Sequence, residues 1–161
     1  MQDKTEKGFS LNHDQIEQYL EISHPFLMID YVEEIIPGKS AHGIKILTED
    51  DWFFKCHMQR ELAMPGTLQI EAMLQTLVLT IYTMEGHKGK FSFISNINSK
   101  LITKISPNNR FVIHADLISY KRGIANGVAV GKINNVKVCQ GEFTLISPHD
   151  MLIPKKKKKL K

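Results

Sequence analysis

The stretch that decides the fold reads LAMPGTLQIEAMLQTLVLTIYTM and spans residues 62–84. Pro65 stands near its start, where proline suits the first turn of a helix, and Gly86 follows its end. Nearly every face of such a helix is apolar, and a helix of this kind is buried. At about 1.5 Å per residue it would run close to 30 Å, the width of a small domain. We therefore expect one buried helix from Pro65 to about Met84.

Strand-like runs surround this segment. Asn134 and Asn135 separate the last two runs and favour a tight hairpin, because asparagine tolerates positive φ. We expect a short helix over residues 14–20, loosely held polar residues 1–12, and an aromatic loop after the acidic residues 49–51. Several antiparallel strands with one long buried helix predict an α+β fold. The expected strands cover residues 26–36, 40–47, 91–97, 101–105, 111–120, 124–133 and 136–146.

The length of 161 residues fits one domain, which we place at residues 1–150, followed by a disordered lysine-rich tail over residues 151–161. Removal of residues 154–161 is expected to leave folding and catalysis unchanged. Six lysines lie in the last seven residues and account for most of the net charge of +4. Without them, the chain has 15 Lys and Arg residues and 17 Asp and Glu residues. We therefore expect no basic surface and no nucleic-acid partner.

The two cysteines, Cys56 and Cys139, are too few for a disulfide framework and fit a reducing compartment. The N-terminal residues contain no apolar stretch typical of a signal peptide. No run reaches the ~18 apolar residues that a membrane span needs. These features predict a cytoplasmic protein without a membrane span.

Glu71 is the single charged residue within residues 62–84. A buried carboxylate is costly unless it is paired or protonated, so a functional site would explain its presence. The alternative is a structural bond from Glu71 to a backbone amide or a lysine. His57 lies fourteen residues earlier, after an aromatic loop and before the expected helix N-terminus at residues 64–66, which would offer free backbone amides. A base, an acid and amide donors suit proton abstraction beside a thioester carbonyl.

Three motifs carry a resemblance to a known family. FFKCH at residues 53–57, MPGTL at residues 64–68 and EAMLQ at residues 71–75 together resemble the active-site run of the 3-hydroxyacyl-(acyl carrier protein) dehydratases. The spacing of fourteen residues from histidine to acid is also that of the family. HPFLMID at residues 24–30 is similar to the family's N-terminal strand motif, and the likeness extends over residues 24–147.

The resemblance implies a hotdog fold, in which a curved antiparallel sheet wraps around one long helix. It implies a homodimer or higher oligomer, with each active site taking its histidine from one chain and its acid from the other. His57 would remove the C2 proton, and Glu71 of the partner subunit would help the C3 hydroxyl leave as water. The amides of Gly66 and Cys56 would hold the thioester oxygen, and Phe54 would contact the substrate. The substrate would be an acyl carrier protein or CoA thioester, and no metal or other cofactor is implied.

Residues 58–62 depart from the family pattern, which has Phe after the histidine, so a differently shaped loop with extra charges is expected there. Two other functions stay open. A hotdog thioesterase would use the helix carboxylate to activate water, and a non-catalytic subunit would only bind acyl groups. The spacing of His57 and Glu71 favours dehydration. Cys56 is an alternative nucleophile, although adjacent side chains in an extended loop point apart.

Overall fold

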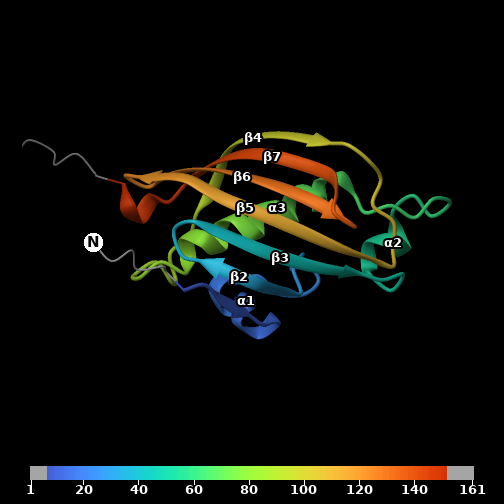
Figure 1. Ribbon diagram of the computed structural model, residues 1–161, viewed down its shortest axis with the longest axis horizontal. Coiled ribbons are helices and arrows are strands. Elements are labelled where there is room, and N and C mark those ends of the chain that lie inside the picture. The colour runs from blue at the N-terminus through green and yellow to red at the C-terminus, as the bar shows by residue number, and fades with distance from the viewer. Residues whose placement is uncertain (1–6, 152–161) are drawn as a thin grey trace, which may run out of the picture.

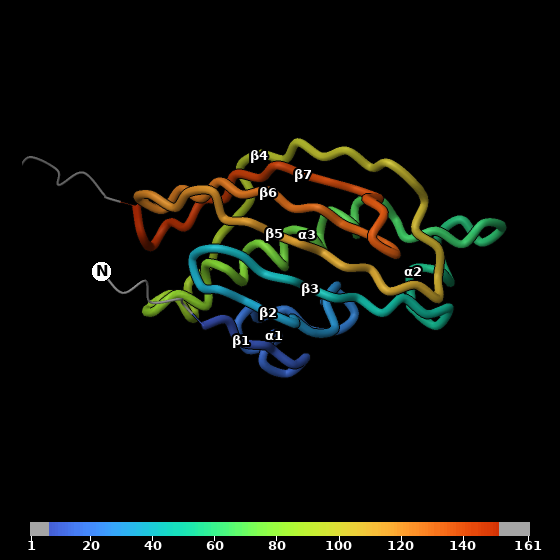
Figure 2. The backbone as a smooth tube through the Cα atoms, viewed as in Figure 1, coloured from blue at the N-terminus to red at the C-terminus, as the bar shows by residue number. Residues whose placement is uncertain are grey.

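The computed structural model describes residues 7–151, and its main feature is an antiparallel sheet that wraps around a long helix (Figure 1). The strand order is β1-β2-β3-β5-β6-β7-β4, and each neighbouring pair is antiparallel. Figure 2 shows β1 and β4 at opposite edges of this sheet. The strands are β1 (Phe9–Leu11), β2 (Tyr31–Ile36), β3 (Ser40–Leu47), β4 (Phe93–Leu101), β5 (Asn109–Lys121), β6 (Ile124–Ile133) and β7 (Val136–Ile146). The helices are α1 (His13–Leu20), α2 (Trp52–Cys56), α3 (Gly66–Tyr82) and the short 3₁₀ helix η1 (Pro148–Asp150). The predicted α+β hotdog fold is confirmed.

The central helix α3 begins at Gly66, directly after Pro65, and ends at Tyr82, close to the predicted bounds. Glycines on the sheet let the strands lie directly on it. A Cβ atom added to Gly43 would lie 2.4 Å from Thr76 Oγ1, and one added to Gly127 would lie 2.5 Å from Leu77 Cδ1. Both distances are far shorter than a normal contact, so a side chain at either position would push the sheet away from α3.

The prediction of one buried helix holds for most of α3, but one part of the helix is only partly covered. Leu68, Ile70, Glu71 and Val78 are only half-buried in the single chain. The other positions from Ala72 to Tyr82 lie in the core. A half-covered apolar stripe on a helix of this composition indicates a surface that the single chain leaves partly open.

Several local predictions hold and several need correction. Residues 14–20 form α1 as expected, and Asn134 and Asn135 make the hairpin turn with φ of 48° and 64°.

The strand predicted over residues 26–36 is shorter, because β2 begins only at residue 31. Residues 91–97 and 101–105 were predicted as two strands, but one strand, β4, replaces them. Residues 9–11 form β1 where loose chain was expected, and the aromatic loop contains helix α2. The predicted tail, residues 151–161, lies outside the described residues except for Met151.

Strand β4 is an exposed edge. It pairs with β7 on one side, and it carries the large apolar side chains of Phe93, Ile94, Ile97 and Leu101, each more than 40% exposed. A long apolar edge strand presents unpaired backbone groups and is a template for pairing with another chain. Among residues 7–151, no helix is long and apolar enough to cross a membrane.

Asp150 attaches η1 to the rest of the molecule. Its carboxylate accepts hydrogen bonds from Lys90 Nζ at 2.5 Å and from the Tyr120 hydroxyl at 2.5 Å, and it lies 3.3 Å from His87 Nε2. The bond from Lys90, and then that from Tyr120, holds the pKa of Asp150 below its ordinary value. Burial and the bond to Asp150 raise the pKa of Tyr120 to about 12.

Replacing Asp150 with alanine is therefore expected to lower the free energy of unfolding at pH 7 by about 1–2 kcal/mol. A depressed carboxyl pKa stabilises the fold above the unfolded value of about 3.9, and this contribution is lost as the pH falls through the folded pKa. Urea denaturation at pH 7 and pH 3 should show the difference shrinking in acid. Asp14, whose side chain is 89% exposed, supplies the control Asp14→Ala. An equal difference at both pH values would contradict this assignment.

Candidate active site

His57 stands at the end of a single helical turn. Helix α2 buries Phe53 and Phe54 in the core, and His57 follows it with extended backbone angles (φ −127°, ψ 122°). His57 Nδ1 lies 3.2 Å from the carbonyl oxygen of Ala63. Because a carbonyl can only accept, this bond requires the proton on Nδ1, which leaves the lone pair of a neutral ring on Nε2. His57 is thereby oriented as a base through Nε2.

The His57 side chain lines a groove of about 420 Å³ together with the start of α3. Gly66 lies in the same groove, and a Cβ atom at this position would lie 2.3 Å from Leu101 Cδ1, so glycine is needed for this close approach. The first amides of α3 have no partner within the helix, and they lie at its positive end. A developing negative charge on a substrate oxygen in this groove would be stabilised by them. The remaining lining residues are Met58, Glu61, Ala63, Met64, Gln69, Ile102, Thr103 and Lys104.

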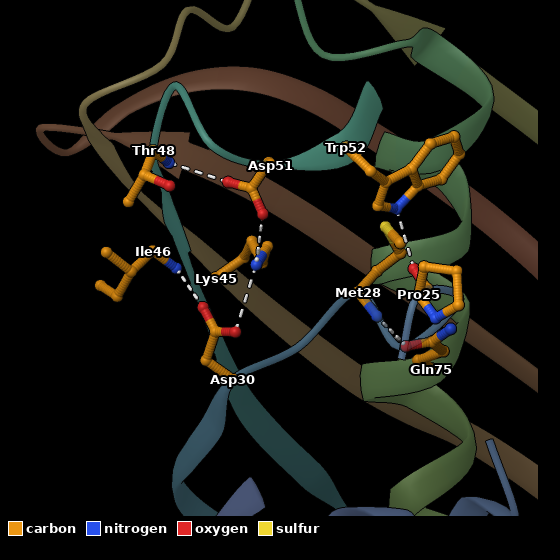
Figure 3. Close-up of polar contacts among 9 residues, drawn as sticks. All are labelled: Pro25, Met28, Asp30, Lys45, Ile46, Thr48, Asp51, Trp52 and Gln75. Atoms are coloured by element: carbon orange, nitrogen blue, oxygen red, sulfur yellow. Dashed lines mark hydrogen bonds and ion pairs between the residues drawn. The ribbon is translucent and has the colours of Figure 1, made fainter. Parts of the chain in front are cut away.

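Glu71 is held by Gln75, one turn further along α3. Gln75 Nε2 donates to Glu71 Oε1 at 2.8 Å and to the carbonyl of Phe26 at 3.0 Å. Gln75 Oε1 accepts from the amide of Met28 at 2.8 Å, which fixes which way the side-chain amide points (Figure 3). Glu71 is half-buried, and its partner is a glutamine side chain instead of the backbone amide or lysine of the structural alternative.

An apolar pocket of about 210 Å³ lies beside Glu71. It follows one face of α3 through Leu74, Val78 and Tyr82, at the spacing of successive helical turns. The Tyr82 hydroxyl accepts a hydrogen bond from the amide of Ser92 at 2.7 Å. The pocket thus begins at a carboxylate and continues along aliphatic side chains, an arrangement that suits a ligand with a polar head and an apolar chain. Its other lining residues are Leu20, Ile22, Gln75, Phe91, Ile94 and Leu145.

Within one chain, the structure brings His57 and Gly66 into one groove, whereas Glu71 lines a different pocket. Cys56 is exposed, with its thiol 3.4 Å from the carbonyl of Trp52, and Phe54 is buried in the core. Neither Cys56 nor Phe54 lines the groove, so their roles in substrate binding stay predictions. Cys56 ends a helix, so the extended loop expected for it is wrong. Among residues 7–151, no group of three or more His, Cys, Asp and Glu side chains could hold a metal ion.

The loop over residues 58–62 forms a tight turn after His57. Met58 has a positive φ of 47°, and the Glu61 amide donates to the Met58 carbonyl at 2.8 Å, which closes a turn. Lys104 Nζ lies 2.6 Å from Glu61 Oε1, and this hydrogen bond lowers the pKa of Glu61. Both charges line the His57 groove, so they largely neutralise one another at its mouth.

Sequence reasoning assigned no role to Gln75. The available signal was its position four residues after Glu71, because side chains at this spacing lie next to one another on a helix. Its contacts with Phe26 and Met28 join residues 49 and 47 positions apart, respectively, and carry no local signal.

The antiparallel sheet wrapped around α3 defines a hotdog protein, in which His57 lies near the start of this helix and Glu71 lies on its half-covered face. The family model described as the FabA-like domain matches residues 21–142, and the chain belongs to this family. The 3-hydroxyacyl-[acyl-carrier-protein] dehydratase FabZ of Clostridium novyi is 32% identical over 135 residues, which cover 83% of this chain and 95% of that protein. The FabZ of Caldicellulosiruptor saccharolyticus is 37% identical over 127 residues, covering 78% of this chain and 91% of the relative.

Solved structures share the fold at low sequence identity. The dehydratase heterocomplex ApeI:P from Xenorhabdus doucetiae superposes with a TM-score of 0.69 at 12% identity, covering 83% of this chain and 90% of the other. Cj0977, a sigma28-regulated virulence protein from Campylobacter jejuni, gives a TM-score of 0.67 at 13% identity, covering 87% of this chain and 92% of the other. At such identities these likenesses concern the fold alone.

Proposed function

We propose that this protein is a lyase that dehydrates a 3-hydroxyacyl thioester, carried by acyl carrier protein, to the trans-2-enoyl thioester in fatty-acid or related acyl-chain synthesis. One observation carries the proposal. In a chain of the FabA-like domain family, His57 presents Nε2 beside the start of α3, and Glu71 projects from the same helix, held by Gln75. The FabZ relatives have the corresponding activity in their names.

The chemistry is an elimination across C2 and C3 of the acyl chain. His57 Nε2 removes the C2 proton, and the negative charge that develops on the thioester oxygen is held by the amide of Gly66 at the positive end of α3. The electron pair of the C2–H bond forms the C2=C3 double bond as the C3–O bond breaks. Glu71 of the partner subunit donates a proton to the departing hydroxyl, which leaves as water. The apolar pocket beside Glu71 takes the rest of the acyl chain.

Pairing of the β4 strands of two chains would complete the site. Leu101, at one end of β4, lines the His57 groove, and Ile94, near the other end, lines the Glu71 pocket. If two β4 strands pair antiparallel, the 101 end of one chain meets the 94 end of the other. This pairing would place His57 of one chain near Glu71 of the partner subunit and would cover the exposed apolar side chains of β4. The proposal therefore includes a homodimer or higher oligomer as the active form.

The direct test offers the purified protein a series of 3-hydroxyacyl thioesters, on acyl carrier protein and on CoA, over a range of chain lengths. Formation of enoyl thioester, measured by absorbance and mass spectrometry, supports the proposal. Release of free thiol without enoyl product would instead indicate a thioesterase, and an unchanged substrate would indicate a non-catalytic acyl-binding protein. The cytoplasmic location also remains a prediction, one that fits the two free cysteines.

A further inference from the structure

Lys45 is a buried lysine placed between two carboxylates. Only 8% of this residue is exposed, and its Nζ atom lies 3.2 Å from Asp30 Oδ1 and 3.0 Å from Asp51 Oδ1 (Figure 3). The second oxygen of each carboxylate accepts a hydrogen bond from a backbone amide. Asp30 Oδ2 accepts from Ile46 at 2.6 Å, and Asp51 Oδ2 accepts from Thr48 at 2.8 Å. The geometry of the group is therefore fixed from several directions, and Lys45 is its only cation among residues 7–151.

The carboxylate of Asp51 connects this group to helix α2. Asp51 directly precedes α2, and the next residue, Trp52, donates its indole N–H to the carbonyl of Pro25 at 2.9 Å. Five residues make little more than one helical turn, and a helix so short has almost no stability of its own. The position of α2 is set by these two contacts and by the burial of Phe53 and Phe54. His57 follows α2 directly, so its position depends on the same contacts.

The segment over residues 25–30 also holds the helix that carries Glu71. Its Phe26 carbonyl and Met28 amide bond to Gln75, which in turn bonds to Glu71. Pro25 and Asp30, at the two ends of the segment, attach α2 through Trp52 and Lys45. The elements that carry the proposed base and the proposed acid are thus tied to one short segment (Figure 3).

We propose that Lys45 is a positioning residue for His57: it holds Asp51, at the start of α2, to Asp30 in the segment that also holds Gln75. This inference rests on the proposed dehydratase function. Without the cation, two poorly solvated carboxylates face one another and repel, so the start of α2 moves away from Asp30. A displacement of about 1 Å is enough to lower a rate by about 100-fold when the reacting groups must be aligned.

The test uses Lys45→Met, which keeps the length of the side chain but removes its charge. We expect kcat for dehydration to fall by about 10–100-fold, with KM changed less than about 3-fold. Trp52 is the single tryptophan of the chain, so its indole N–H gives one unambiguous NMR signal, which should shift or broaden. Lys55→Met is the matched control, because Lys55 lies on α2 itself and pairs with Asp50 on the surface, with 63% and 95% of the two side chains exposed. It should leave both kcat and the Trp52 signal unchanged.

A second variant separates positioning from simple charge balance. Lys45→Met with Asp51→Asn removes the repulsion and keeps an acceptor for the Thr48 amide, but it does not restore the connection to Asp30. We expect the melting temperature to recover while kcat stays low. Recovery of both the melting temperature and kcat in the double variant would overturn the proposal. A Lys45→Met variant with normal kcat and an unchanged Trp52 signal would also overturn it. If the unmodified protein dehydrates no substrate, the proposed function fails, whereas the Trp52 signal still decides whether Lys45 fixes α2.

Discussion

Replacing His57 with alanine is expected to lower kcat for dehydration by about 10²–10⁴-fold, the range typical of a general base. The imidazole is half-buried and makes one polar contact, with the Ala63 carbonyl, so its loss should shift the melting temperature by only about 2 °C. The measurement is enoyl formation at saturating substrate, together with thermal unfolding of the same preparation. No other side chain in the groove can take the place of Nε2, because the groove's remaining ionisable groups are Glu61 and Lys104, which pair with each other.

The control for this prediction is His13→Ala. His13 is exposed at the first position of α1 and lies far along the chain from the groove. Its replacement should leave kcat unchanged. Normal turnover in His57→Ala, or a loss that merely follows the fraction of unfolded protein, would show that His57 has a structural role only.

Replacing Glu71 with glutamine is expected to lower kcat by a similar factor of about 10²–10⁴. The glutamine keeps the size of the side chain and can still accept the hydrogen bond from Gln75, so the fold should be preserved. It can no longer transfer a proton to the departing hydroxyl. Glu85→Gln supplies the control, because Glu85 is exposed just beyond the same helix. Enoyl formation and melting temperature should be measured for both variants.

A purely structural Glu71 would give the opposite pattern, with a lowered melting temperature and normal turnover of the folded protein. The double variant adds a further check. Because both groups act on one elimination step, His57→Ala with Glu71→Gln should lose less than the product of the two single losses. Multiplicative losses would mean that the two residues act on separate steps.

Local sequence signals were sufficient for the main elements of the fold. The apolar composition of α3 and the proline before it gave the helix almost to the residue, and Asn134 with Asn135 gave the hairpin. Short elements were missed because periodicity needs several turns or several alternations to be recognised. Helix α2 has five residues and β1 has three, so neither could show a pattern.

The candidate site was predictable where its residues are close in sequence. His57, Gly66 and Glu71 fall within fifteen positions, and their spacing carried the prediction. The contacts that hold them were not predictable. Lys45 meets Asp30, and Gln75 meets Met28, only because β2, β3 and α3 pack together. The half-covered face of α3 was also missed, since composition alone does not tell a face covered by the sheet from one that the single chain leaves partly open.

A subunit-mixing experiment tests the central claim, that His57 of one chain acts with Glu71 of the partner subunit. The two single variants, His57→Ala and Glu71→Gln, are unfolded together in equal amounts and refolded, so that chains combine at random. A shared site predicts that half of the dimers pair one variant with the other, and that each such dimer regains one intact site. Enoyl formation should therefore return to about a quarter of the rate of the unmodified protein. If mixed dimers form but remain as inactive as the two parents, the site is not shared between chains and the account is wrong.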